Sequence, residues 1–209
     1  MELFSPSPIP LVAILSGLTP AEAPIVGRIL FDAGFRMLEV PLNRPGAVDA
    51  MHALLHIAPD NALIGAGIVL SIDDVETVRE AGGRLITSPH CEPEVIAYAA
   101  GLGMIAMPGV TTPTEAYRAL EAGAHGLKLF PAEMIPPAAV KAMRAILPVD
   151  TPLFPDGSIH PHNMSAYLAA GATGFGIGSQ LYRPRIDENA LARAAAAFML
   201  ARSNLLSEL

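Results

Sequence analysis

Short apolar runs that could form buried strands recur eight times along the chain, and segments with helical spacing separate them. The runs lie near residues 10–15, 35–40, 62–66, 84–87, 104–107, 124–129, 152–154 and 173–177. Helical spacing is clearest over Ala21 to Ala33, Ala47 to Ile57, Ile72 to Ala81 and Pro113 to Ala122. Glycines that suit left-handed helix caps lie at Gly34, Gly82, Gly103, Gly123 and Gly171. This alternation predicts an α/β fold, a (β/α)8 TIM barrel with a closing helix near 187–206; a doubly wound sheet is the alternative.

Composition limits the class of protein. With 209 residues, 52% of them hydrophobic, and no linker-like segment, we expect a single domain over residues 1–209. Only 16% of residues are charged, below the roughly 25% usual in soluble domains, which predicts a homo-oligomer. The net charge of -7 and the lack of basic clusters argue against nucleic acid or an anionic membrane as partner.

Cysteine usage and the first residues indicate the compartment. The single cysteine, Cys91, cannot form an internal disulfide, and Met1 to Pro6 lacks the basic start and apolar core of a signal peptide. Both features predict a cytoplasmic protein. The uncharged stretch from Val95 to Thr114 is long enough to imitate a membrane span, but glycines and prolines interrupt it. We expect a helix end followed by a strand there.

Two charged residues interrupt runs that otherwise read as buried strands. Lys128 lies within the apolar run 126–130, and Glu39 lies within 37–42. Charge is costly in such positions, yet both residues fall near the carboxyl ends of strands, where TIM barrels keep their chemistry. A desolvated lysine loses its proton more readily, and a neutral amine attacks a ketone to form a Schiff base. We therefore expect a buried amine with its own acid/base. Taken singly, Lys128 could reach water, and Glu39 could cap a helix or pair with an arginine.

Four stretches, at 38–43 (LEVPLN), 65–67 (GAG), 127–131 (LKLFP) and 176–179 (GIGS), resemble the 2-keto-3-deoxy-6-phosphogluconate/galactonate aldolases. Within that family, the forms at 11–15 (LVAIL), 41–43 (PLN) and 181–183 (LYR) resemble the phosphogalactonate branch most. The resemblance spans about residues 9–184. It implies a class I aldolase on a (β/α)8 barrel, a homotrimer without metal or other cofactor, acting on a keto acid or ketone and an aldehyde.

The resemblance also implies roles for individual residues. Lys128 matches the Schiff-base lysine, and Glu39 matches the general acid/base that moves protons during cleavage of the C3–C4 bond. The remaining substrate-binding positions include five that match the family pattern: Asn43, Gly67, Pro89, Pro108 and Phe130. Pyruvate and an aldehyde, glyceraldehyde 3-phosphate in the phosphogalactonate branch, would be the products.

Departures from the family pattern cluster where the two ends of a substrate should lie. Ser16 replaces an arginine and Ile68 replaces a threonine, both near the substrate carboxylate. A charge-assisted hydrogen bond contributes roughly 1.5–3 kcal/mol, so substrate binding should weaken by at least an order of magnitude. At the phosphate end, 156–158 reads Asp-Gly-Ser instead of a glycine pair, and Asp156 should repel a phosphate or accept bonds from hydroxyls.

Backbone amides could still bind an anion at that end. The amides of Gly157 and Ser158, with those of Gly178 and Ser179, are the candidates for such a cradle. Because both catalytic candidates are retained, we expect a working aldolase with altered specificity and little requirement for phosphate on the acceptor. Whether the differences arose by divergence or by design stays open.

Two other functions stay open on the sequence. One is a metal-dependent barrel lyase or isomerase that uses Glu39 and Asp156 as ligands. The other is a non-catalytic trimeric scaffold whose pocket is a relic. Borohydride reduction in the presence of a ketone separates all three, because only an imine at Lys128 leaves a stable adduct.

Overall fold

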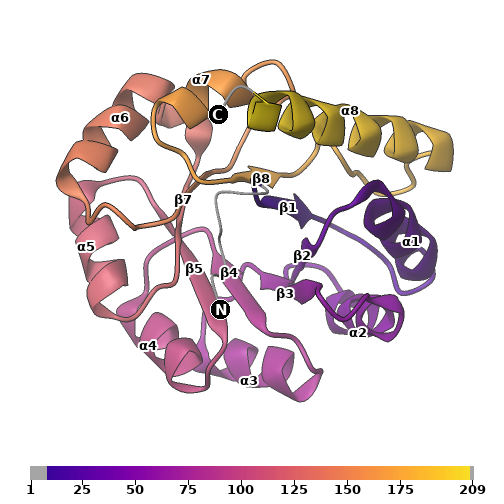
Figure 1. The fold of residues 1–209 in the computed structure, drawn as a ribbon. Coiled ribbons are helices and arrows are strands. Elements are labelled where there is room, and N and C mark those ends of the chain that lie inside the picture. Colours follow the sequence, from indigo (N-terminus) through magenta and orange to yellow (C-terminus); the bar gives the residue numbers. More distant parts are fainter. Residues whose placement is uncertain (1–8, 208–209) are drawn as a thin grey trace.

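A computed structural model describes residues 9–207, which form a barrel of eight parallel strands surrounded by helices (Figure 1). The strands are β1 (Leu11–Ile14), β2 (Met37–Pro41), β3 (Leu63–Gly67), β4 (Leu85–Ser88), β5 (Ile105–Val110), β6 (Leu127–Leu129), β7 (Leu153–Pro155) and β8 (Phe175–Ile177). The helices are α1 (Ala23–Ala33), α2 (Ala47–Ile57), α3 (Ile72–Glu80), α4 (Pro93–Gly101), α5 (Pro113–Glu121), α6 (Pro137–Ile146), α7 (Met164–Ala169) and α8 (Glu188–Ser207). The predicted (β/α)8 fold is confirmed; the opening segment 1–6 lies outside the described residues.

Strand order shows how the barrel closes. The hydrogen-bonded order is β7-β6-β5-β4-β3-β2-β1-β8, and each of the seven pairs is parallel. One residue past β7, Asp156 forms a parallel bridge with Gly176 of β8 and so joins the two ends of the order. Because all strands run the same way, their carboxyl ends and the loops that follow lie at one end of the barrel.

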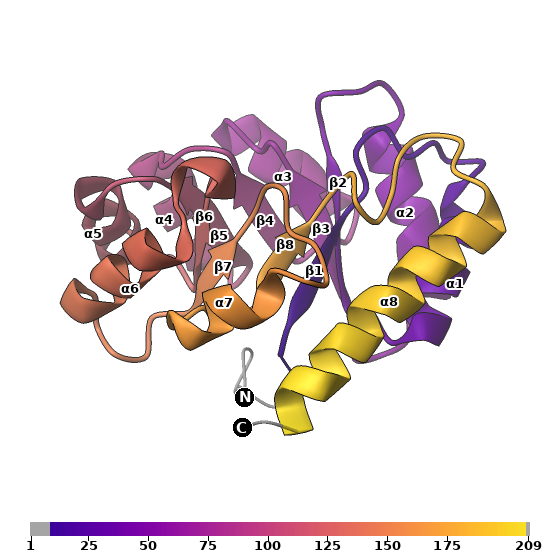
Figure 2. The same cartoon turned by 90° about the horizontal axis from the view of Figure 1, so that it is seen from above.

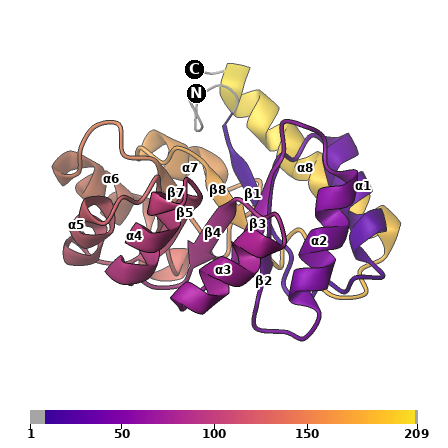
Figure 3. The ribbon, with the colours of Figure 1, turned by 90° about the horizontal axis from the view of Figure 1, so that it is seen from below.

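Helices cover the outside of the barrel, as Figures 2 and 3 show from two further directions. The long α8 lies alongside α1 and covers the barrel next to β8 and β1. No helix within residues 9–207 is both long and apolar enough to cross a membrane. The uncharged stretch 95–114 forms the end of α4 and then β5, as the sequence predicts.

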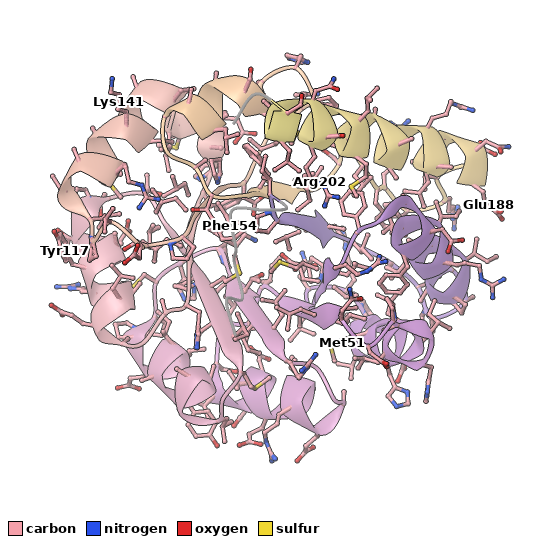
Figure 4. The ribbon with its side chains drawn as sticks, viewed as in Figure 1. Met51, Tyr117, Lys141, Phe154, Glu188 and Arg202 are labelled. Carbon is pink, nitrogen blue, oxygen red and sulfur yellow. The ribbon has the colours of Figure 1, made fainter. Side chains whose placement is uncertain are left out.

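Two apolar cores lie on the two faces of the strands. The smaller one fills the barrel with Val12, Met37, Leu85, Ile105, Met107 and Phe154. The larger one packs the outer strand faces against the helices. Figure 4 shows Phe154 near the middle of the barrel, while Tyr117, Lys141 and Glu188 lie at the periphery. Alternation along each strand therefore decides which side chains reach the interior.

Local signals fix the ends of the helices. All five glycines expected to cap helices have the positive φ of the left-handed region. Ser71 and Thr112 each form a capping box, with Asp74 and Glu115 respectively. The helix predicted from Ala21 begins two residues later, at Ala23, because the preceding turn is held by bonds between Thr19 and Glu22.

Candidate active site

Lys128 points into the barrel and meets two carboxylates there. Its Nζ atom lies 3.2 Å from Oε1 of Glu39 and 2.7 Å from Oδ2 of Asp156. Glu39 reaches the amine from β2, across the barrel, whereas Asp156 follows β7, the strand next to β6. The side chains of all three residues are at most 9% exposed. The expected meeting of Lys128 and Glu39 in one buried site is confirmed.

The pleat of the strands explains why these side chains share one level. Along a strand every second side chain faces inward. The residue two positions after an apolar interior residue therefore also faces inward, nearer the carboxyl end of the strand. In β2 Glu39 follows Met37, in β4 Thr87 follows Leu85, and after β7 Asp156 follows Phe154. Together with Lys128 they form what we call the polar layer: Glu39, Thr87, Lys128 and Asp156. It lies at the carboxyl end of the barrel, directly above the apolar interior.

Glu39 has one oxygen that is bonded and one that is not. Oε1 accepts a hydrogen bond from the Thr87 hydroxyl at 2.9 Å and faces the amine of Lys128. Oε2 is buried and makes no hydrogen bond with any residue from 9 to 207. Gly67 leaves the room for this oxygen, since a Cβ at that position would lie 1.6 Å from it. A buried acceptor without a partner is costly in a folded protein unless a ligand or water uses it.

The protonation state of Lys128 differs from the expectation drawn from its burial. Burial alone lowers the pKa of the amine, but the carboxylates of Asp156 and Glu39 outweigh it and raise the pKa above the ordinary value. Beside these two carboxylates the amine is therefore a charged ammonium group, and the expectation of a neutral nitrogen is wrong for this arrangement. A reaction at Lys128 first requires that its proton be removed.

Asp156 turns its carboxylate toward Lys128 and so shares one site with Lys128 and Glu39. Its carboxylate contacts the Lys128 amine, and its backbone is bonded to residues of the β6 side and bridged to Gly176 of β8. The Asp156 amide donates to the Leu129 carbonyl at 3.1 Å, and its carbonyl accepts from the Ala132 amide at 2.8 Å. The motif 156–158 is therefore divided: the Asp156 side chain turns inward to the amine, and Gly157 and Ser158 form the turn beside it.

An acidic side chain, Glu133, lies against the predicted anion-binding turn. Gly157 and Ser158 have φ angles of 118° and 49°. The Ser158 hydroxyl donates to the carboxylate of Glu133, a residue of the 3-10 helix Ala132–Met134, and the second oxygen of Glu133 lies against Gly157. The Asn163 side-chain amide donates to the Ser158 carbonyl at 3.0 Å and holds this turn. An acidic group beside the turn opposes a bound anion.

Each remaining predicted binding residue lies at the carboxyl end of a strand or in the loop that follows. Gly67 ends β3, and Pro108 lies in β5 opposite Ser88. Exposed or half-buried positions after the strands are Ser16, Asn43, Ile68, Pro89, Phe130, Gly178 and Ser179. Ile68 has a φ of 52°, which is rare for a β-branched residue and marks backbone strain beside the site. The structure thus brings these residues to one end of the barrel without assigning them a ligand.

The geometry disfavours the metal site that the sequence left open. The ammonium group of Lys128 contacts both Glu39 and Asp156, the two ligands which that hypothesis requires. Within residues 9–207, no group of three or more His, Cys, Asp or Glu side chains is arranged to hold a metal ion.

Sequence reasoning missed two residues of the site, Thr87 and Glu133. A signal existed for Thr87, because a polar side chain in the strand-like run at 84–87 occupies the same inward phase as Leu85. The sequence has no such signal for Glu133, because an acidic residue shortly after Pro131 is common in a loop. Only the fold brings Glu133 beside Ser158.

Comparison with known proteins gives a consistent set of relatives. Residues 8–197 match the family model described as "Aldolase: KDPG and KHG aldolase". The chain is 44% identical over 192 residues to the "Probable 2-dehydro-3-deoxy-6-phosphogalactonate aldolase" of Rhizobium meliloti (strain 1021), covering 92% of this chain and 91% of the relative. It is 43% identical over 193 residues to the 2-dehydro-3-deoxy-6-phosphogalactonate aldolase of Escherichia coli (strain K12), covering 92% and 94%. A solved structure described as "Native KDPGal structure" superposes with a TM-score of 0.92 at 42% identity, covering 95% and 96%.

Proposed function

Because the chain belongs to the KDPG and KHG aldolase family, which cleaves 2-keto-3-deoxy sugar acids by class I chemistry, we propose that Lys128 forms the Schiff base and Glu39 moves the protons. The observation that carries this assignment is the buried contact of 3.2 Å between the Lys128 amine and the Glu39 carboxylate. The substrate is a 2-keto-3-deoxy sugar acid, and the products are pyruvate and an aldehyde.

In the reaction, Lys128 acts first and Glu39 acts after it. The Lys128 nitrogen adds to the 2-keto group and, after loss of water, forms a protonated imine that withdraws electrons from the adjacent carbon. Glu39 takes the proton of the C4 hydroxyl while the C3–C4 bond breaks, which releases the aldehyde and leaves an enamine. The same carboxyl group then returns a proton to the enamine carbon, and hydrolysis of the imine releases pyruvate. The unbonded Oε2 of Glu39 is the atom available for these transfers.

Borohydride trapping with pyruvate tests the assignment directly. The chain has two lysines, and Lys141 is exposed on α6, far from the barrel interior (Figure 4). Reduction should add one pyruvate-derived group to the peptide that contains Lys128, and the adduct should persist in Lys141→Arg. An adduct on Lys141 alone, or none at all in a folded protein that cleaves substrate, would contradict the assignment.

For the far end of the substrate, we propose an acceptor aldehyde that does not require a phosphate group. The support is the carboxylate of Glu133, which accepts a bond from Ser158 where a phosphate-binding turn is common in TIM barrels. The helix that follows, α7, has only six residues and adds little dipole to bind an anion.

Turnover with matched aldehydes tests this second proposal. Glyceraldehyde should react with pyruvate at least as well as glyceraldehyde 3-phosphate, and Glu133→Gln should raise kcat/KM for the phosphorylated aldehyde only. Removing one exposed charge about 4 Å away changes an interaction by about 1 kcal/mol, so the expected gain is roughly fivefold. A strong preference of the unmodified chain for the phosphorylated aldehyde would refute the proposal.

We also propose that the barrel assembles into a homotrimer in the cytoplasm. The low charged content and exposed large apolar residues, including Met134, Val149 and Leu200, support burial of a further surface. The mass measured in solution by light scattering tests the assembly, and a monomer at micromolar concentration would contradict it.

A further inference from the structure

Two carboxylates contact the single nitrogen on which the proposed chemistry depends. We propose that Asp156 is a second catalytic residue, which transfers the proton of the Lys128 nitrogen and of the leaving hydroxyl during imine formation, while Glu39 serves the carbon atoms. The inference rests on the proposed Schiff base at Lys128 and adds a division of labour between the two acids.

The position of Asp156 suits transfer to and from nitrogen. Its Oδ2 atom lies 2.7 Å from Nζ, the shorter of the two carboxylate contacts and within the range for direct proton transfer. Backbone bonds to Leu129 and Ala132 and the bridge to Gly176 fix the residue. Gly176 also crowds the side chain, since a Cβ there would lie 2.8 Å from the Asp156 carboxyl carbon. The carboxylate is therefore held against the amine from the neighbouring strand.

Glu39 is less suited to the same step. Its contact with the amine is longer, at 3.2 Å, and the oxygen concerned already accepts a bond from Thr87. Its free oxygen, Oε2, lies on the Gly67 side of the carboxylate, where a substrate hydroxyl could be received. Among the buried side chains of residues 9–207, Glu39 and Asp156 are the only carboxylates, so no third acid competes for either task.

The protons of the proposed step move between Lys128, Asp156 and the carbonyl oxygen, with no net gain or loss. The ammonium proton of Lys128 passes to Asp156, which leaves a neutral amine and a carboxylic acid with no change in net charge. The nitrogen lone pair forms the bond to the carbonyl carbon, and the carbonyl oxygen takes up the amine proton to give a neutral carbinolamine. Asp156 then protonates the departing hydroxyl, water leaves, and the resulting iminium remains paired with the Asp156 carboxylate.

Two isotope exchanges of pyruvate separate the two acids. Loss of ¹⁸O from the labelled keto group reports imine formation and hydrolysis, whereas uptake of deuterium into the methyl group reports protonation of the enamine carbon. Asp156→Asn should slow the oxygen exchange by about 100-fold, the middle of the range for general acid/base catalysis. Glu39→Gln should slow the methyl exchange by a similar factor and leave the oxygen exchange within about threefold of the unmodified rate. Asp60→Asn, the same change at an exposed position, controls for the loss of a negative charge.

The outcomes distinguish this inference from the Schiff-base proposal. Faster or unchanged oxygen exchange in a folded Asp156→Asn protein would overturn the catalytic role of Asp156. That result would mean that the carboxylate only keeps the Lys128 amine protonated, since its removal would then speed imine formation. Loss of all exchange in the unmodified chain would instead defeat the proposed function itself.

A measurement on the unmodified chain tests the inference without a variant. Among residues 9–207, Lys128 forms ion pairs with Glu39 and Asp156 alone, and transfer between Lys128 and Asp156 takes no proton from solvent. The oxygen-exchange rate should therefore change by less than about threefold between about pH 6 and 9, whereas deprotonation by solvent would raise it roughly tenfold per pH unit. The steep rise would contradict the inference.

Discussion

The interior of the barrel has two levels that differ in composition and in what they do. The lower level consists of apolar side chains such as Met37, Leu85 and Phe154, which pack against each other without charge. The polar layer directly above it contains two carboxylates, two residues after Met37 and Phe154, and the charged amine of Lys128 from β6. The same pleat places both levels, so their difference is one of side chains and not of backbone.

The contrast shows where stability and reactivity reside. Close packing of the lower level stabilises the barrel through burial of apolar area. Charges in the polar layer are buried and are held by one another and by the Thr87 hydroxyl, an arrangement that adds little net stability and breaks at a high cost. The raised pKa of Lys128 is the chemical consequence, since the amine exchanges water for two carboxylates. Changes in the lower level should therefore affect stability only, and changes in the upper level should affect both stability and proton transfer at Lys128.

The largest expected effect on folding comes from the lower level. Phe154 is fully buried, and its ring lies against Gly126 of the β6 edge and Gly174 before β8. Phe154→Ala should lower the free energy of unfolding by about 3–5 kcal/mol, because it leaves a cavity that the strands cannot fill. Urea denaturation measures this loss, and Phe154→Leu, which keeps most of the volume, should lose clearly less. Borohydride trapping of the folded fraction should persist; its disappearance would show that the two levels are not separable.

Removing the amine should destabilise the polar layer by a similar or slightly smaller amount. Lys128→Met leaves Glu39 and Asp156 facing each other without a cation and should cost roughly 3 kcal/mol near pH 7. Because folding raises the pKa of Lys128, its contribution is fully present below the unfolded pKa of about 10.4 and declines as pH rises through the folded value.

Denaturation curves from neutral to alkaline pH measure this dependence. Lys141→Met is the matched control, since the same change on exposed α6 should shift stability by no more than about 0.5 kcal/mol at any pH. A loss for Lys128→Met that is the same at every pH would show that packing, and not charge, holds the polar layer together.

A methyl group at Gly67 should alter the chemistry with little effect on the nitrogen. The Cβ of Gly67→Ala would lie 1.6 Å from Glu39 Oε2 and must displace that carboxylate. Deuterium exchange into pyruvate should fall on the order of 100-fold, equivalent to about 2.7 kcal/mol, while trapping at Lys128 changes far less. Gly101→Ala, where an added Cβ meets nothing within 4 Å, is the matched control. Equal losses of exchange and trapping would mean that Glu39 also serves the nitrogen.

Much of the fold could be predicted because its signals are local. The strand runs, helical spacing and capping glycines each depend on a few adjacent residues, and all eight strands lie where the sequence placed them. Lys128 and Glu39 likewise stand out from their apolar neighbours in the sequence, so they can be recognised without knowing which residues contact each other. Their meeting follows once parallel strands place their carboxyl ends together.

The electrostatics of the site could not be predicted in this way. The state of Lys128 depends on Asp156, which lies 28 positions away in sequence and reaches the amine only through the pairing of β6 with β7. Burial by itself predicts the opposite direction for the pKa. Glu133 illustrates the same limit, because its contact with Ser158 depends on how two loops fold toward each other.

The smallest expected effect concerns the turn beside the polar layer. Ser158 adopts a φ of 49°, in the left-handed region that costs an L-residue roughly 1–2 kcal/mol, and it is exposed. Ser158→Gly removes this strain but increases the freedom of the unfolded chain, so the net gain in unfolding free energy should be about 0.5 kcal/mol. Ser179→Gly, at an exposed serine without positive φ, should instead lower stability by a similar amount. A loss of unfolding free energy in both variants would show that the hydrogen bond from Ser158 to Glu133 contributes more than the backbone strain costs. Glu133 would then be held more firmly than an exposed side chain usually is.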